Sequence, residues 1–349
     1  MNPPRSQPRD RRQTAAAGTR GVTGLPLRPA VTLLRGLQAG LARGLGPVEA
    51  VGGTASGLPR EARARLQSAL RRLQGDFPED EWGFDEGFAD VMLPLLETMY
   101  DHWWRVEALG VPNVPAHGRA LLVANHAGAL PWDAAMIAMA VLREHPLPRH
   151  VRFLVLRWVI DLPWLSTAVR KLGGAVASPY NAIRLLEQDQ LVAVFPEGAR
   201  AIGKDWSERY RLGRFGRGGF VEIALRSGAP IVPVAVVGSE EIYPKLADVR
   251  PLAKLIGAPY FPITPTFPAL GPLGAVPLPS RWRIEFGEPI ETASFGPEAA
   301  DDRRLVLELA EHVRETIQER LLTGVFERGS AFVRRRGPFR ARARTNRLG

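Results

Sequence analysis

The chain has 349 residues, of which 45% are hydrophobic and 23% are charged, a composition typical of a globular protein with a substantial core. It contains no cysteine, which excludes disulfides, thiolate metal sites and cysteine nucleophiles. The formal net charge of +10 is concentrated at the ends: residues 1–20 hold five arginines and one aspartate, and residues 328–349 hold eight arginines and no acid. Because the body between them is close to neutral, its charge gives no support to a specific nucleic-acid partner.

The first third of the chain has two parts. Residues 1–58 are rich in Pro, Arg, Gly and Thr, and we expect them to be disordered or weakly helical. We expect residues 59–104 to form an amphipathic helical segment, with one helix beginning at Pro59 and a second over residues 84–104, because apolar residues recur at helical spacing. Two interpretations stay open for their apolar faces, packing on the main domain or contact with an anionic membrane surface.

Residues 105–325 alternate between short apolar runs and helical stretches, which predicts an α/β domain with a mostly parallel central sheet flanked by helices. Strands are expected at residues 120–124, 151–156, 191–195, 231–237 and 282–286, and helices at residues 131–144, 164–172, 182–188, 220–227 and 301–322. Residues 326–349 follow as an Arg-rich disordered tail.

One segment of this domain breaks the alternation. Residues 259–279 are apolar but carry too many prolines for a helix or an inner strand. An apolar loop is either covered by the core or in contact with something apolar. The segment therefore either packs over the domain or contacts lipid or an acyl chain.

His126 follows the first expected strand and precedes Gly128 and Pro131. A neutral imidazole accepts a proton from a hydroxyl, and it does so better when a carboxylate fixes its tautomer. Asp133 is the nearest carboxylate in sequence, but seven residues of continuous helix would separate the two by about 10 Å. If they pair, residues 127–130 must fold back as a loop; otherwise Asp133 only complements the dipole of the helix that begins at Pro131.

A second motif, Phe195-Pro196-Glu197-Gly198-Ala199-Arg200, leaves a buried strand through a glycine turn. Such turns direct backbone N–H groups at an anion or a developing oxyanion. Further along, Arg214 and Arg217 lie in a glycine-rich run that precedes a helix, which indicates either an anion-binding loop or a solvated one.

Together these residues resemble the glycerolipid acyltransferase family, whose members carry an Asn-His motif with a following aspartate and a later Phe-Pro-Glu-Gly-x-Arg motif. The resemblance implies that His126, oriented by Asp133, deprotonates the acceptor hydroxyl, which attacks the thioester of acyl-CoA or acyl carrier protein directly. Both carriers are co-substrates, and no cofactor or metal is implied. The substrate-binding residues implied are Asn125, Phe195, Pro196, Glu197, Gly198 and Arg200, and the glycine-rich run adds Arg214 and Arg217 as candidates.

Two departures from the family pattern bear on the acceptor. Six residues rather than four separate His126 from Asp133, which is more similar to the monoacylglycerol and diacylglycerol acyltransferase branch. Residues 173–181, which match the block where the family has an arginine for the acceptor phosphate, contain none. We expect the acceptor to be a lysophospholipid, a glycerol phosphate or a mono- or diacylglycerol, and the two departures count against the phosphorylated ones.

We expect an enzyme associated peripherally with the cytoplasmic face of a membrane, because no apolar run approaches the roughly 20 residues of a membrane span, no signal peptide is evident, and arginine tails bind anionic lipid. A lipid esterase or thioesterase is an alternative, although the chain lacks a Gly-x-Ser-x-Gly motif. A non-enzymatic adaptor bound to anionic surfaces is another. The sequence gives no indication of the oligomeric state.

Overall fold

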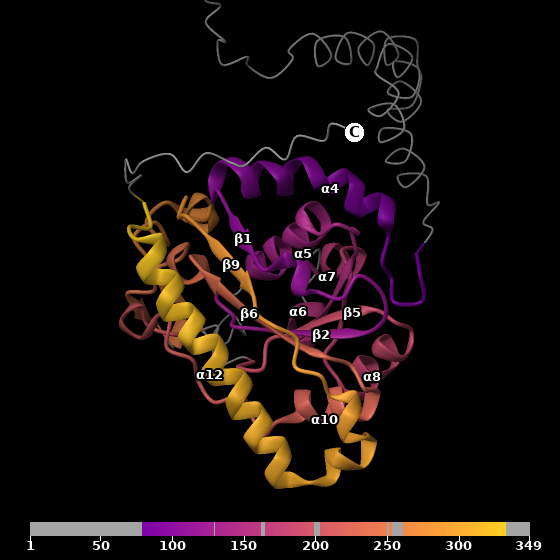
Figure 1. Cartoon of the computed structure of the whole chain (residues 1–349). Coiled ribbons are helices and arrows are strands. Elements are labelled where there is room, and N and C mark those ends of the chain that lie inside the picture. Colours follow the sequence, from indigo (N-terminus) through magenta and orange to yellow (C-terminus); the bar gives the residue numbers. More distant parts are fainter. Residues whose placement is uncertain are drawn as a thin grey trace, which may run out of the picture. The chain divides into compact units, whose positions relative to one another are not determined.

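The computed structural model describes residues 79–128, 130–161, 165–198, 203–249, 251–252 and 261–332 (Figure 1). The region predicted to be disordered or weakly helical, the helix expected from Pro59, and residues 333–349 of the predicted tail lie outside the described residues.

A seven-stranded sheet, mostly parallel as predicted, forms the centre of the domain. Its order is β1-β9-β6-β2-β5-β3-β4. β9 runs antiparallel to β6, β1 runs parallel to β9, and every other neighbouring pair is parallel. The strands are β1 (Glu107–Leu109), β2 (Ala120–Ala124), β3 (Val151–Val155), β4 (Gly174–Val176), β5 (Leu191–Val194), β6 (Ile231–Val237) and β9 (Arg283–Phe286).

The central strand β2 determines where the functional residues lie. Its five residues are fully buried, as expected of an apolar strand covered on both faces. It pairs in parallel with β5 on one side and β6 on the other. The carboxyl ends of these three strands therefore meet at one edge of the sheet, the edge at which open α/β sheets bind ligands.

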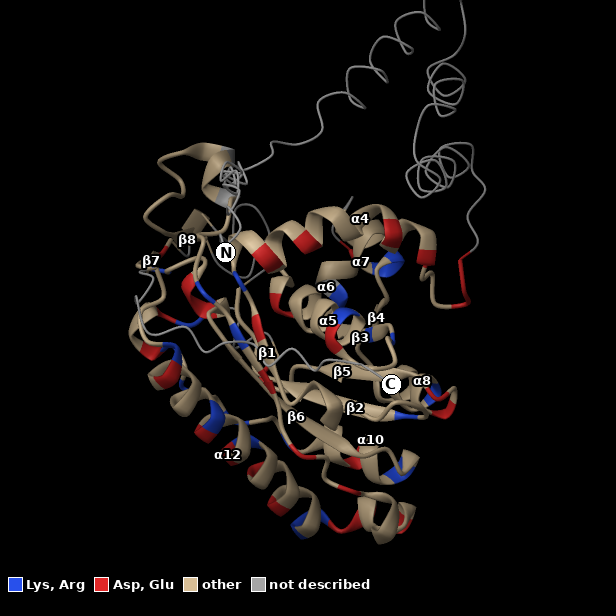
Figure 2. Cartoon of the chain, turned by 45° about the horizontal axis from the view of Figure 1, so that its top comes forward, with Lys and Arg blue, Asp and Glu red and all other residues tan. Residues whose placement is uncertain are grey.

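Helices cover both faces of this sheet, as the alternating pattern predicts (Figures 1 and 2). Buried residues of α5 pack on one face, and buried residues of α8, α10 and α12 pack on the other. The described helices are α4 (Glu86–Thr98), α5 (Trp132–Glu144), α6 (Arg157–Ile160), α7 (Leu165–Lys171), α8 (Pro179–Glu187), α10 (Gly219–Ser227) and α12 (Arg303–Arg328). None of these is long and apolar enough to cross a membrane.

The helix predicted over residues 84–104 is observed as α4 followed by a π-helical turn, Met99–Trp103. α4 contacts α5 and α7, so its partly buried face packs on the domain. Trp104 is fully buried and stacks on Trp282 with ring centroids 4.6 Å apart. The indole of Trp104 thus belongs to the core and not to a membrane interface.

The last helix is longer than predicted. α12 begins after Asp302, whose side chain accepts hydrogen bonds from the first turn, and continues through Arg328 rather than ending near residue 322. Arg328 is buried and forms a bidentate ion pair with Glu241. The boundary expected at residue 326 therefore falls inside α12, and Arg328 belongs to the folded domain.

The proline-rich segment contains neither a long helix nor an inner strand in its described part, residues 261–279. The short strand β8 (Pro262–Ile263) pairs antiparallel with β7 (Ala247–Asp248), and a 3₁₀ turn follows at Gly271–Ala275. The side chains of Leu270, Leu273 and Val276 are exposed. At least these side chains are not covered by the core.

Candidate active site

His126 and Asp133 are in direct contact at the carboxyl end of β2. The His126 Nδ1 lies 2.6 Å from the Asp133 Oδ2, and the same oxygen accepts a hydrogen bond from the Ala127 N–H at 2.9 Å. Gly128 has a φ of +75°, a conformation that favours glycine and lets the chain turn back before α5 begins at Trp132. The fold-back required of residues 127–130 is therefore present.

The buried carboxylate fixes how the imidazole is presented. Asp133 is fully buried, and its second oxygen accepts a hydrogen bond from the Ala134 N–H at 2.8 Å. An ionised carboxylate only accepts hydrogen bonds, so the Nδ1 of His126 carries the proton that points at Asp133. The Nε2 is then left unprotonated, which is the state that a general base requires.

The charges around His126 act on its pKa in opposite directions. Burial by itself lowers the pKa, but the charge and hydrogen bond of Asp133, with a smaller contribution from Glu197, raise it above its ordinary value against the lowering effect of Lys204. The ring also packs on Phe195, with centroids 4.6 Å apart. The imidazole is thus a stronger base than in water and is held between an aromatic ring and a carboxylate.

Asn125, expected among the substrate-binding residues, has a different position. It is fully buried, its side-chain amide donates to the Val236 carbonyl at 3.0 Å, and its side-chain oxygen accepts from the Val236 N–H at 2.7 Å. Both groups of the amide are hydrogen-bonded within the protein, so Asn125 joins the end of β2 to β6 directly before His126.

The second motif lies beside His126, as its place after the neighbouring strand β5 requires. Phe195, Pro196 and Gly198 line the cavity that His126 also lines. Gly198 has a φ of +60° and donates its N–H to the Phe195 carbonyl at 3.0 Å, so this N–H closes the turn and is not free for an oxyanion. Arg200 lies outside the described residues.

Glu197, also expected to bind substrate, is engaged by the protein. Its side chain is 1% exposed. One oxygen pairs with Lys204 at 2.9 Å and accepts from the Gly213 N–H at 2.9 Å, while the other makes a long contact of 3.5 Å with the His126 N–H. This carboxylate therefore has a structural role in the site, and its ion pair and hydrogen bonds leave it little capacity to bind a substrate.

Arg214 and Arg217 precede α10, as expected. Both are exposed, and neither forms an ion pair with a carboxylate in the part of the chain that the structure describes. Arg217 lines the cavity, and Gly218 caps α10 with a φ of +83°. Their role in anion binding stays a prediction.

The cavity itself has a volume of about 540 Å³ and is lined mostly by apolar side chains. Its lining includes His126, the side chains of Leu93 and Leu96 from α4, the small residues Ala135 and Ala138 from α5, and Phe153 from β3. No sequence motif marks these residues as functional. The signal that was available is the run of small residues on one face of the helix after Pro131.

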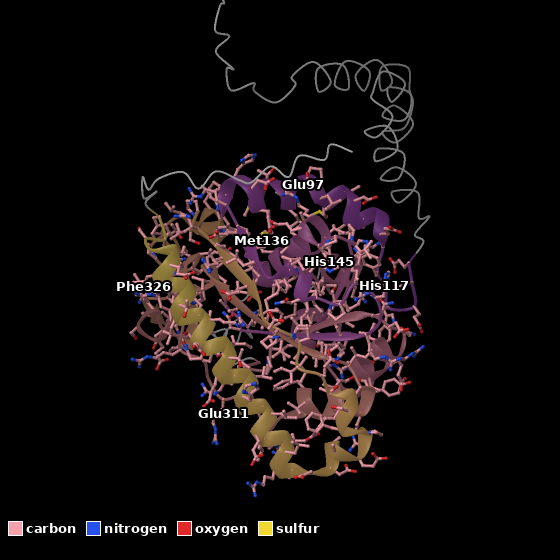
Figure 3. All side chains as sticks on the ribbon, in the orientation of Figure 1. Glu97, His117, Met136, His145, Glu311 and Phe326 are labelled. Atoms are coloured by element: carbon pink, nitrogen blue, oxygen red, sulfur yellow. The ribbon has the colours of Figure 1, made fainter. Side chains whose placement is uncertain are left out.

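The other histidines differ in setting. His145 lies inside the domain, and both of its ring nitrogens contact backbone carbonyls, those of Leu147 and Val114 (Figure 3). His117 is exposed. His150 lines the far part of the cavity beside Phe84, and burial lowers its pKa. In the described structure, no group of three or more histidines or acidic residues is arranged to hold a metal ion.

This chain is similar to several known proteins. A family model described as Acyltransferase matches residues 105–237. The uncharacterized protein Rv0502 of Mycobacterium tuberculosis is 54% identical over 258 residues, which are 73% of this chain and 72% of that protein. The Bos taurus protein named DGAT1/2-independent enzyme synthesizing storage lipids is 25% identical over 217 residues, or 62% of this chain and 59% of that protein.

Among solved structures, the crystal structure of PlsC, the 1-acyl-sn-glycerophosphate (LPA) acyltransferase of Thermotoga maritima, is also similar. It shares 18% identity with a TM-score of 0.46, over 88% of this chain and 99% of that one. The Acyltransferase family model, which matches residues 105–237, includes both His126 and Glu197. The chain belongs to the glycerolipid acyltransferase family and is an O-acyltransferase.

Proposed function

We propose that this protein transfers a fatty acyl group from acyl-CoA or acyl carrier protein to the hydroxyl of a lipid, with His126 as general base. The observation that carries the proposal is the His126–Asp133 pair, with its 2.6 Å contact, at an apolar cavity of about 540 Å³. An apolar cavity with a base in its wall suits a substrate that carries a hydroxyl group on a hydrocarbon body.

The reaction takes place without an acyl-enzyme. The Nε2 of His126 accepts the proton of the acceptor hydroxyl as its oxygen bonds to the thioester carbonyl carbon. The carbon–sulfur bond then breaks, and the imidazolium returns the proton to the departing thiolate. Asp133 stabilises the imidazolium between these two steps, because its carboxylate is buried and faces the Nδ1.

The apolar part of the cavity is suited to the fatty acyl chain. Leu93 and Leu96 of α4 and Ala135 and Ala138 of α5 offer it surface without charge. Each buried methylene contributes about 0.8 kcal/mol, so a long chain gains substantial affinity from such a lining. Arg217, at the same cavity and without a described acidic partner, is placed to bind a phosphate of the acyl carrier.

We favour a neutral lipid alcohol as acceptor over a phosphorylated one. Gly174, Ala177, Ser178 and Pro179 line the cavity, and they come from the stretch where an arginine for the acceptor phosphate would be expected. No cation occupies that stretch, residues 173–181. The similarity to a protein named as an enzyme synthesizing storage lipids supports the same choice.

We further propose that the protein acts at the cytoplasmic face of an anionic membrane as a peripheral enzyme. The exposed Leu270, Leu273 and Val276 and the uncharged run around them give an apolar surface, and Figure 2 shows no charge on the loop that follows β8. The arginines of residues 334–347 add electrostatic attraction to anionic lipid.

The experiment is acyl transfer from radiolabelled acyl-CoA by purified protein, with diacylglycerol and lysophosphatidic acid offered separately. We expect His126→Ala to abolish transfer and the surface change His117→Ala to leave it intact. Equal transfer by His126→Ala and the unchanged protein would refute the mechanism. A preference for lysophosphatidic acid would refute the neutral acceptor alone.

A further inference from the structure

The loop after the second motif brings a lysine into the charged surroundings of His126. The side chain of Lys204 is 13% exposed, and its Nζ lies 2.9 Å from the Glu197 Oε2 and 3.4 Å from the Glu240 Oε1. Both carboxylates are more deeply buried than the lysine, at 1% and 6% exposed. The ammonium thus joins two buried carboxylates that come from different parts of the fold.

Those two carboxylates stand at the ends of the strands on either side of His126. Glu197 follows β5, and Glu240 lies in the 3₁₀ turn Ser239–Glu241 that follows β6. The sheet order places β2, which ends just before His126, between β5 and β6. The Glu197–Lys204–Glu240 bridge therefore spans the end of the strand that carries the base.

Each carboxylate is in turn attached to backbone. Glu197 accepts from the Gly213 N–H at 2.9 Å and faces the His126 N–H at 3.5 Å, and Glu240 accepts from the Tyr210 N–H at 2.8 Å. Two buried carboxylates without a cation between them would repel each other. The ammonium of Lys204 contacts both and offsets this repulsion.

We infer that Lys204 is a positioning residue of this acyltransferase: its ammonium holds Glu197 beside the backbone of His126 and offsets the negative charge around the imidazole. The inference rests on the proposed role of His126 as the base. The charged groups of described residues that act on this imidazole are Asp133 from α5, Glu197 after β5 and Lys204 itself. Lys204 is the cation among them, so its removal leaves two carboxylates and no cation.

The test is the variant Lys204→Met, read by NMR titration of the His126 imidazole and by the pH dependence of kcat/KM. The loss of a nearby cation should raise the His126 pKa and move the acidic limb of the rate profile to higher pH. We expect kcat to fall about tenfold with little change in the KM for the acyl donor. Lys204→Arg, which keeps the charge, should restore the wild-type midpoint.

The chain offers a matched control in Lys171. This lysine also bridges two carboxylates, those of Glu79 at 2.9 Å and Asp85 at 3.2 Å, and the fully buried Asp85 makes the setting similar. Lys171→Met should lose comparable stability in urea unfolding and leave the His126 midpoint unmoved. Equal midpoints in Lys204→Met and the unchanged protein, or equal shifts in both lysine variants, would overturn the inference.

Should Lys204→Met not fold, Glu197→Gln tests the same bridge from its other end. It keeps the shape of the side chain but removes a negative charge, so the His126 midpoint must move downward; no movement overturns the inference. The titration measures the imidazole directly, so its result does not depend on catalytic activity. If the proposed function fails, the unchanged protein transfers no acyl group or transfers it equally well as His126→Ala, whereas failure of this inference leaves transfer dependent on His126 with an unshifted Lys204→Met variant.

Discussion

Replacement of Asp133 by asparagine perturbs the contact that joins base and carboxylate while it leaves the size of the side chain unchanged. The Asp133 carboxylate accepts three hydrogen bonds: one oxygen takes those of His126 and the Ala127 N–H, and the other takes that of the Ala134 N–H. An amide has one accepting oxygen and one nitrogen that only donates. Whichever way the asparagine is turned, a donor faces a donor inside the protein.

The size of the effect follows from these two arrangements. If the amide nitrogen faces His126, the Nδ1 must become the acceptor and the proton moves to the Nε2, which removes the base; the same wrong tautomer in Ser-His-Asp enzymes costs about 10⁴-fold in kcat. If the oxygen faces His126, the tautomer is kept but the negative charge that strengthens the base is lost. The expected loss is then about 10²-fold, the lower end of what general-base catalysis contributes. We therefore expect kcat/KM to fall between about 10²-fold and 10⁴-fold.

The assay is acyl transfer across a range of pH, with Asp189→Asn as a control at an exposed aspartate. Activity needs the neutral imidazole, so it should rise with pH through a midpoint above 6.5, because Asp133 and Glu197 together raise the His126 pKa against the lowering effects of burial and Lys204. In Asp133→Asn the residual activity should have its midpoint at lower pH. A variant that kept more than about a tenth of kcat/KM would refute the assignment of Asp133, since less than about 1.4 kcal/mol of transition-state stabilisation would then be lost.

Three further predictions concern the cavity and the buried charges. Ala138→Leu should fill part of the cavity and lower kcat/KM for long acyl donors relative to short ones by about tenfold, because each methylene kept out loses about 0.8 kcal/mol; a series of acyl-CoA chain lengths measures it. Arg328→Met should lower the free energy of unfolding in urea by about 3–5 kcal/mol, because Glu241 stays buried without its partner, and the added change Glu241→Gln should recover much of this loss. Burial raises the pKa of Glu240 from 4.5 to about 6, so the stability due to this group is present below pH 4.5 and is lost as the pH rises through 6. Glu240→Gln removes this dependence, and the stability of the unchanged protein relative to the variant should fall by about 2 kcal/mol between pH 4 and pH 7.5; a difference that is constant with pH would contradict the reasoning.

The sequence was informative about the fold where hydrophobic runs are long. The apolar runs of β2 and β6 predicted both strands with the observed bounds, because each is buried along its whole length. β1 and β4 have three residues each, too few for a pattern to form, and they were missed. The antiparallel direction of β9 depends on its pairing with β6, which no local pattern records.

Within the site, the two motifs were each predicted to follow a strand, and because β2 and β5 pair in parallel, His126 and Glu197 lie at the same edge of the sheet. The pairing of Asp133 with His126 was conditional on a loop, and the positive φ of Gly128 decides it. The ion pair between Glu197 and Lys204 could not be predicted from the sequence, because it depends on the path of the loop after residue 202. Sequence motifs therefore located the site, but tertiary contacts assign the role of each carboxylate.

The buried pair of Arg328 and Glu241 has a consequence for how the arginine-rich end should be studied. A shortened protein that stops before Arg328 removes the partner of a carboxylate next to Glu240, and Glu240 belongs to the bridge beside His126. Such a protein would lose activity because a buried ion pair is broken, and this loss would be mistaken for a function of the tail. A truncation after Phe332 removes seven arginines and keeps the pair, so it separates surface binding from catalysis.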